Sequence, residues 1–303
     1  MSVPGLTSTR SAKGLAALER ASQGRSLWDD AGRRLMRNKA AVVSMVVMAI
    51  IFLAALIGPF LLPYKFEVIT KTDVLAAPLV HGHLLGADSL GRDLFARILT
   101  GLRVSLAVGV VATAVALVIG ILWGAIAGYF GGMVDEVMMR IVDVLYSLPF
   151  IFFVIILTVT FGRNILLIFV AIGAVSWLTM SRIVRAQTMS LKQMEFVEAS
   201  RAIGLGRLQI ILRHIVPNLL GPVVVYVTLT VPDVILTEAF LSFIGMGVQE
   251  PMTSLGVLIN SGTSYMELAP GLLIFPCLVM AVTLLALNLI GDGLRDALDP
   301  KDR

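Results

Sequence analysis

Charged residues are scarce in this sequence, and so is cysteine. Only 15% of the 303 residues are Asp, Glu, Lys or Arg, whereas 57% are hydrophobic. Soluble domains carry about 25% charged residues, so this balance excludes an ordinary soluble domain and indicates an integral membrane protein. The single cysteine, Cys277, excludes a disulfide within the chain.

Motifs for nucleotide binding and for catalysis are missing as well. No glycine is followed by lysine, which excludes a Walker A phosphate loop, and there is no G-x-S-x-G, H-E-x-x-H or C-x-x-C pattern. We therefore expect no enzyme activity and no cofactor in this chain. His81 and His83 form an H-x-H pair, but such a pair is weak evidence for a metal site, and surface histidines on a loop are the simpler interpretation.

Long hydrophobic runs dominate what is present, and they predict an all-α fold with six transmembrane helices. The runs cover about 40–62, 104–126, 137–160, 165–180, 219–244 and 270–290. Pro149 predicts a bend in the third run. Small residues recur every four positions along the second run and predict a helix-packing face. These residues are Ala112, Ala116, Gly120, Gly124 and Gly128.

Polar segments separate or flank the hydrophobic runs. An N-terminal segment with a surface helix (1–39) and a short tail (292–303) enclose the transmembrane domain, 40–291. The loop 63–100 is predicted to contain a turn and an interfacial amphipathic helix. The loop 245–269 contains no Lys or Arg.

The distribution of basic residues predicts orientation. With six spans, only six of the 24 Lys and Arg residues fall on the side of the loops 63–100 and 245–269. The positive-inside rule therefore places both termini and the polar loop 182–217 in the cytoplasm. This asymmetry also explains the net charge of +4 without nucleic-acid binding.

The polar loop 182–217 carries the clearest local signal. Met194 to Ile203 has helix-forming residues with apolar spacing, and Gly204 with Gly206 offers a helix stop. Leu208 to Ile215 is predicted to be a second short helix that ends at Pro217. Two short helices between membrane spans are typical of a docking element, although an ordinary amphipathic connector fits the same periodicity.

The spacing of Glu198-Ala199-Ser200, Gly204 and Pro217 resembles the EAA loop of ABC importer permeases. Ser200 replaces the second alanine of that motif, and His214 and Val216 also depart from it. The resemblance implies a coupling helix that fits a groove on a separate ATPase. Small residues at 199, 200 and 202 would keep that helix thin. The coupling residues implied are Glu198, Ala199, Ser200, Arg201, Ala202, Gly204 and Pro217.

Further motifs resemble the dipeptide/oligopeptide/nickel group of these permeases, and most narrowly the second membrane subunit of oligopeptide permeases. They are Arg25-Ser-Leu-Trp, Leu85-Gly-Ala-Asp-Ser-Leu-Gly-Arg-Asp-Leu, Gly128-Tyr-Phe-Gly-Gly, Phe240-Leu-Ser-Phe-Ile-Gly-Met-Gly and Gly291-Asp-Gly-Leu-Arg-Asp-Ala-Leu-Asp-Pro-Lys-Asp-Arg. The resemblance implies a bacterial inner-membrane importer. Its other parts would be a second homologous permease subunit, two ATPases that bind ATP and Mg, and a periplasmic peptide-binding protein. Dipeptides, glutathione or nickel stay open as substrates.

Two acidic residues, Asp233 and Glu238, lie within the fifth run, and intramembrane acids are functional candidates. Glu238 lies deeper and is the stronger candidate for a water-filled translocation pathway. Pairing with a polar group on a neighbouring helix is the alternative. A proton-coupled secondary transporter acting through Glu238 would need an internal repeat, which we do not find. An intramembrane enzyme would need a paired catalytic constellation, and none is evident.

Overall fold

The computed structural model describes residues 27–162 and 164–298. In these residues the chain is helical apart from its connecting loops and one isolated β-bridge between Ala87 and Asp93. Five helices are long and apolar enough to cross a membrane, or six if the bent pair α5–α6 counts as one span. The expected all-α membrane fold is therefore confirmed. Expectations for residues 1–26, Arg163 and 299–303 lie outside the described residues.

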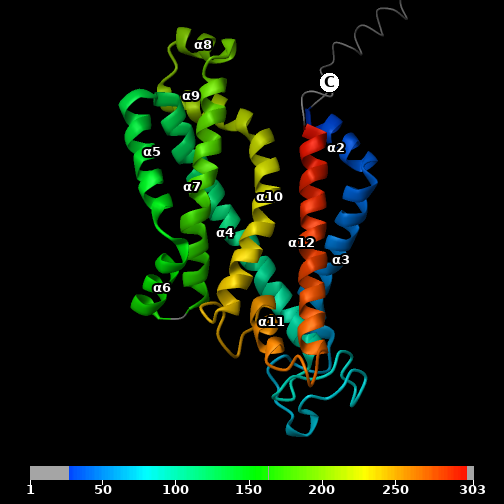
Figure 1. The fold of residues 1–303 in the computed structure, drawn as a ribbon. Coiled ribbons are helices and arrows are strands. Elements are labelled where there is room, and N and C mark those ends of the chain that lie inside the picture. The colour runs from blue at the N-terminus through cyan, green and yellow to red at the C-terminus, as the bar shows by residue number, and fades with distance from the viewer. Residues whose placement is uncertain (1–26, 163, 299–303) are drawn as a thin grey trace, which may run out of the picture.

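Figure 1 shows a bundle in which α4 runs diagonally between two groups of helices. One group contains α2 (Leu27–Arg37), α3 (Lys39–Leu61) and α12 (Gly271–Leu298). The other contains α5 (Gly132–Ser147), α6 (Phe150–Phe161) and α7 (Ile165–Leu191). The remaining helices are α4 (Leu94–Phe130), α8 (Glu195–Ala202), α9 (Arg207–Ile210), α10 (Val216–Phe243), α11 (Leu255–Thr263) and a 3-10 turn at Lys71–Asp73.

The prediction of a separate interfacial helix in the loop 63–100 is wrong. Residues from Leu94 onward form the first turns of α4, which continues unbroken into the second span. The Asp93 side chain accepts a hydrogen bond from the Ala96 backbone N–H at 2.7 Å and so caps the helix. Leu94, Arg97 and Ile98 are each only 1% exposed. These turns are therefore buried by the rest of the protein, not laid on a membrane surface.

The bend predicted at Pro149 is confirmed. α5 and α6 meet at an angle of 80° around Leu148 and Pro149. Leu148 has an extended backbone with ψ of 128°, because the ring of a following proline disfavours helical geometry at the preceding residue. Pro149 then caps α6, so the third run forms two helices instead of one straight span.

The second short helix expected at Leu208–Ile215 is wrong as a separate element, and Pro217 does not end it. α9 passes through one π-helical turn, Ile211–Ile215, directly into α10. The Val216 N–H donates to the carbonyl of Ile211, five residues back. A wider turn of this kind relieves the clash that a proline inside a regular helix makes with the preceding turn. Pro217 therefore lies at the start of the long helix α10.

The small-residue face predicted on the second span is confirmed as the contact between α4 and α7. A Cβ added at Gly120 would lie 2.6 Å from the Cβ of Met180, and one at Gly128 would lie 2.7 Å from the carbonyl oxygen of Arg185. At Gly124 an added Cβ would lie 2.9 Å from the Arg185 nitrogen. Real side chains do not approach so closely, so the two helix backbones touch along this face.

Substituting Gly124 by alanine should destabilise the protein, because the added methyl group meets the backbone of α7, which cannot move aside like a flexible side chain. We expect Gly124→Ala to lower the free energy of unfolding by about 1–3 kcal/mol. Thermal unfolding in detergent, followed by circular dichroism, measures the loss. Gly32→Ala in α2 is the matched control, since a Cβ there would meet nothing within 4 Å. Equal stability of the two variants would contradict this close contact.

Candidate functional site

The segment between α7 and α10 extends beyond the ends of the neighbouring helices (Figure 1). We call residues 192–207, which include α8, the α8 segment. It is shorter than the expected loop 182–217, because α7 continues to Leu191 and α9 joins α10. The α8 segment is therefore connected to a long helix on each side, and any displacement of α8 pulls on both α7 and α10.

Gly204 ends α8 as the sequence predicted. Its φ is +83°, a backbone conformation that favours glycine, and a Cβ there would meet nothing within 4 Å. The Gly204 N–H donates to the carbonyl of Arg201, and the Leu205 N–H donates to the carbonyl of Ser200. These two bonds are the Schellman pattern, so the chain reverses in one residue and holds α8 at a defined angle.

The two faces of α8 differ. Val197 is fully buried in a cluster with Tyr129 and Ile210, and Ser200 lies beside it on the same face. Ser200 faces the protein, and its hydroxyl donates to the carbonyl of Phe196 at 2.7 Å. The outer face is exposed and carries Glu198, Ala199, Arg201, Ala202 and Ile203.

Charged side chains anchor the α8 segment and the end of α7 to their neighbours. The Lys192 Nζ donates to the carbonyl of Gly128 at 3.0 Å, and the Arg201 guanidinium lies 5.2 Å from the centre of the Tyr129 ring. The Arg185 guanidinium makes two hydrogen bonds to the Asp135 carboxylate on α5, at 2.5 and 2.6 Å. A bidentate pair of this kind fixes orientation as well as distance, so the base of the α8 segment is rigid.

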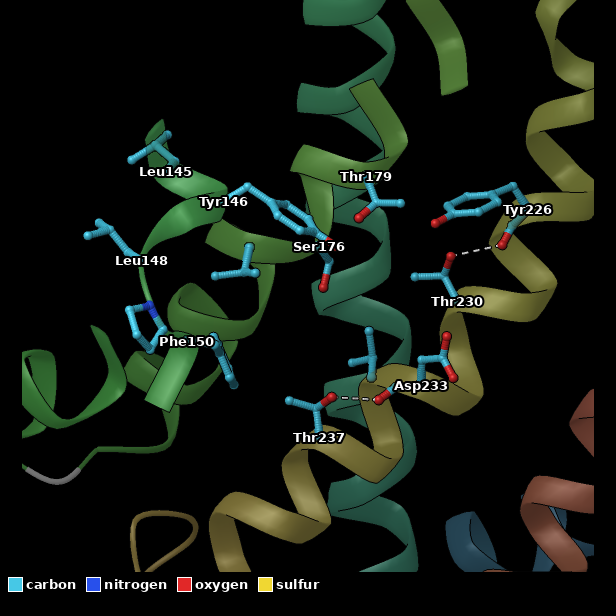
Figure 2. A pocket seen from close by; sticks show the side chains of 13 residues that line it. Leu145, Tyr146, Leu148, Phe150, Ser176, Thr179, Tyr226, Thr230, Asp233 and Thr237 are labelled. Carbon is cyan, nitrogen blue, oxygen red and sulfur yellow. Dashed lines mark hydrogen bonds between the residues drawn. The ribbon is translucent and has the colours of Figure 1, made fainter. Parts of the chain in front are cut away.

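A cavity of about 460 Å³ lies between the α5–α6 bend, α7 and α10 (Figure 2). It is lined by Leu145, Tyr146, Leu148, Pro149, Phe150, Val175, Ser176, Thr179, Tyr226, Thr230, Asp233, Val234 and Thr237. We call it the α10 pocket. The polar residues of α10 in this lining follow one another at spacings of four, three and four residues, which is one helical face. That spacing was visible in the sequence, but we considered only the acids.

The structure separates the two acids of the fifth hydrophobic run. Asp233 is exposed and lines the α10 pocket. Glu238 is fully buried, and its carboxylate accepts hydrogen bonds from Ser105 on α4 at 2.8 Å and from Ser242 at 2.6 Å. The structure therefore shows the alternative for Glu238, which is pairing with a polar group on a neighbouring helix. Glu238 is enclosed by protein and does not line the α10 pocket.

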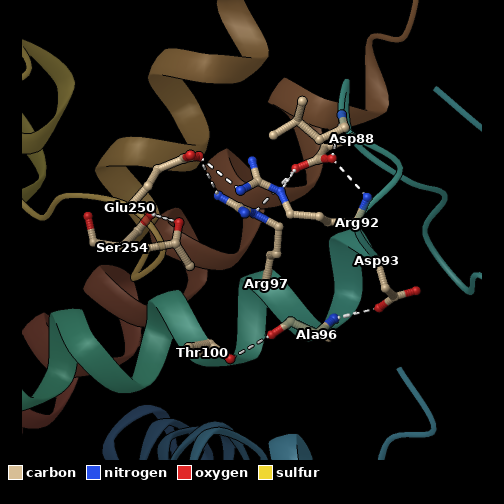
Figure 3. A network of polar contacts seen from close by, with 10 residues as sticks. Asp88, Arg92, Asp93, Ala96, Arg97, Thr100, Glu250 and Ser254 are labelled. Atoms are coloured by element: carbon tan, nitrogen blue, oxygen red, sulfur yellow. Dashed lines mark hydrogen bonds and ion pairs between the residues drawn. The ribbon is translucent and has the colours of Figure 1, made fainter. Parts of the chain in front are cut away.

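At the opposite end of the bundle, ion pairs connect the loop after α3 to the loop after α10 (Figure 3). The Arg92 guanidinium donates to Asp88 at 2.7 Å and to Glu250 at 2.9 Å. Arg97, which is fully buried, lies 3.5 Å from Asp88 and 3.9 Å from Glu250. Two segments 158 residues apart in sequence are thus joined by one charge network.

The expectation that His83 is a surface residue is wrong. Its side chain is 1% exposed, and the centre of its ring lies 4.4 Å from that of the Tyr64 ring, at an interplanar angle of 33°. Nδ1 lies 2.8 Å from Asp93 and Nε2 lies 3.2 Å from Asp73. His81 stays exposed and contacts Asp73 at 2.9 Å. His83 thus forms a cluster with Asp73 and Asp93, and no group of three side chains that could hold a metal ion occurs in residues 27–162 and 164–298.

A solved structure shares the architecture of this bundle. A chain of the MetNI methionine ABC transporter, in an inward-facing conformation, superposes with a TM-score of 0.54 over 67% of this chain and 96% of that chain. The two sequences are 20% identical, so the likeness concerns the fold alone. The chain therefore has the fold of this ABC transporter chain, with five or six helices that could cross a membrane.

Sequence comparison then gives the family. A profile described as "Binding-protein-dependent transport system inner membrane component" matches residues 120–303, and one described as "N-terminal TM domain of oligopeptide transport permease C" matches residues 26–78. Oligopeptide transport system permease protein OppC of Haemophilus influenzae is 52% identical over 93% of this chain and 91% of its own length. OppC of Escherichia coli K12 is 53% identical, with 93% of each chain covered. The chain belongs to the family of inner membrane components of binding-protein-dependent transport systems.

The His83 cluster should make the loop 62–93 sensitive to pH. Burial lowers the pKa of His83, but the hydrogen bonds to Asp93 and Asp73 outweigh it, so this pKa lies above the usual 6.5. The hydrogen bond from His83 holds the pKa of Asp73 below its usual 3.8. Because the pKa of His83 is raised in the folded state, protonation of His83 stabilises the fold fully below pH 6.5. This stabilisation is lost as the pH rises from 6.5 through the higher pKa of the folded state. The lowered Asp73 pKa confines the acid-side loss to below pH 3.8.

We therefore expect amide protons of this loop, such as that of Gly86, to be better protected at pH 5.5 than at pH 8.5. Hydrogen exchange, corrected for the intrinsic rate at each pH, measures this protection. The same difference should vanish in His83→Gln and persist in His81→Gln, because His81 is 62% exposed at its side chain. An unchanged difference in His83→Gln would mean that another group titrates.

Proposed function

We propose that this chain is the permease subunit of an ATP-driven ABC importer that moves oligopeptides from the periplasm to the cytoplasm. The observation that carries the proposal is the similarity to OppC permeases over nine tenths of the chain. ATP hydrolysis falls to partner subunits, since the sequence has no Walker A motif. The complete importer would contain a second homologous permease subunit, two ATPases and a periplasmic peptide-binding protein.

The α8 segment is the proposed coupling element to the ATPase. Glu198, Ala199 and Ala202 present a narrow exposed surface, and the Gly204 turn sets its angle. The Glu198 carboxylate makes no hydrogen bond or ion pair within residues 27–162 and 164–298, so it is available to a partner. A helix with one buried and one exposed face fits a groove on another protein.

The connectivity explains how docking could drive transport. When the ATPases close on ATP, a docked α8 moves with them and carries the ends of α7 and α10. These two helices form walls of the α10 pocket, so a movement at α8 changes the pocket directly. Asp233 is the proposed pathway residue within that pocket, whereas Glu238 serves the packing of α4 against α10 through Ser105.

The orientation follows from charge. In Figure 1, α2, α8 and the end of α12 lie at the same end of the bundle, which is the end rich in Lys and Arg. The positive-inside rule places this end in the cytoplasm. The opposite end, with the loops joined by Arg92 and Glu250, would face the periplasm and receive the binding protein.

A substitution at Gly204 tests the coupling role. Valine at a φ of +83° is strained by about 1–2 kcal/mol, so Gly204→Val should disturb the angle of α8 without filling any contact. We expect the number of peptides taken up per ATP hydrolysed, measured with the complete importer in proteoliposomes, to fall roughly tenfold. Uptake of radiolabelled peptide and phosphate release, measured together, give this ratio.

Gly206→Val is the matched control, because Gly206 has a φ of −65° and equally open surroundings. Glu198→Ala tests the surface itself and should weaken binding of the ATPase subunits. Wild-type coupling in both Gly204→Val and Glu198→Ala would reduce the α8 segment to an ordinary connector. Uptake by the wild-type complex that needs no ATP would contradict the proposed function as a whole.

A further inference from the structure

The α10 pocket has an unusual charge balance for a cavity between membrane helices. Of its thirteen lining residues, Asp233 alone carries a charge, and no basic residue lines the pocket. No donor contacts the Asp233 carboxylate within the described parts of the chain. Asp233 is exposed to this cavity and has no counter-ion among the described residues, so it offers a negative charge to a cation that enters.

Arg182 does not neutralise the Asp233 carboxylate. The Arg182 guanidinium, at the edge of the pocket, donates to Asp143 at 2.8 Å and lies 4.5 Å from the centre of the Tyr146 ring. Arg182 and Asp143 therefore cancel each other. The negative charge of Asp233 stays uncompensated in the cavity.

Three hydroxyl groups of the lining, those of Thr237, Thr230 and Ser176, are arranged as acceptors. Thr237 donates its hydroxyl proton to the backbone carbonyl of Asp233, Thr230 donates to that of Tyr226, and Ser176 donates to that of Ile172. Each proton is thus used within its own helix, and each oxygen has only lone pairs left for the pocket. Figure 2 shows these side chains on α7 and α10 around the cavity, with the Tyr226 ring beside them.

A pocket that offers these three acceptors, one carboxylate and an aromatic ring fits a ligand group that carries donors and a positive charge. An alkylammonium group is such a ligand: it has three N–H donors, no acceptor and a positive charge that aromatic rings attract. A carboxylate would be repelled by Asp233 and would find no basic partner. The cavity volume of about 460 Å³ lies in the range of small-molecule sites.

We propose that the α10 pocket binds the ammonium group of a peptide in transit, with Asp233 as its counter-ion. This inference rests on the proposed function and adds a recognition site inside the permease itself. The ammonium belongs either to the peptide N-terminus or to a lysine side chain, which share this chemistry. Peptides would then pass with a charged end held beside α10, the helix that continues into the α8 segment.

Equilibrium binding to the purified importer complex, without ATP and without the binding protein, tests the proposal. The probes are tri-alanine, N-acetyl-tri-alanine and N-acetyl-Ala-Lys-Ala. We expect wild type to bind tri-alanine roughly tenfold more tightly than its acetylated form, the size expected for one charge-assisted hydrogen bond. Asp233→Asn should remove this difference and Asp233→Glu should keep it. N-acetyl-Ala-Lys-Ala shows which ammonium group is recognised. If it binds as tightly as tri-alanine, the pocket accepts a lysine side chain, and if it binds as weakly as N-acetyl-tri-alanine, the pocket accepts only the N-terminus.

Glu136→Gln is the matched control, since it removes the same charge from an exposed position on α5 outside the pocket. It should discriminate between the probes as wild type does. The proposal is overturned if wild type binds tri-alanine and N-acetyl-tri-alanine alike, if neither binds, or if Asp233→Asn still discriminates. Because this assay uses no ATP, its failure is distinct from a failure of the proposed function, which shows as loss of ATP-dependent uptake.

Discussion

The backbone contact between α4 and α7 is the constraint on which the rest of the structure depends. Without side chains at Gly120, Gly124 and Gly128, the two helices approach until the backbone of one meets the side chains and backbone of the other. Lipid tails are as apolar as leucine, so membrane helices gain little from hydrophobic burial against each other and associate through close packing. This contact positions α7, and through it both the α8 segment and one wall of the α10 pocket.

The enclosed charged groups described above have partners, whereas the exposed Asp233 has none among the described residues. Glu238, Arg92 and Arg185 are each paired with a group on another element, because an unpaired charge away from water is costly. Asp233 has no such partner in the described structure. Asp233 lies in the α10 pocket, on the helix that connects to the α8 segment. Ligand binding and the movement imposed by the ATPases would therefore act on the same helix.

Periodicity and composition predicted much of the fold. The small residues of α4 are visible as a repeat of four, Pro149 marks a bend because its ring disfavours helical geometry at Leu148, and Gly204 marks a turn by its lack of a side chain. Each of these signals is local, and local sterics decide its outcome. Two predictions fail for one reason: polarity places Leu94–Ile98 and His83 at a surface, and the rest of the chain buries them.

By itself, the sequence determined that this is a helical membrane protein, roughly where it crosses the bilayer, and which segment resembles a coupling loop. These features depend on residues close together in the chain. Tertiary structure alone decided that Asp233 is exposed while Glu238 is enclosed, that Arg92 meets Glu250, and that α9 merges with α10. Such outcomes depend on which surfaces meet after folding, and the energy of a buried charge is set by partners that lie far away in sequence.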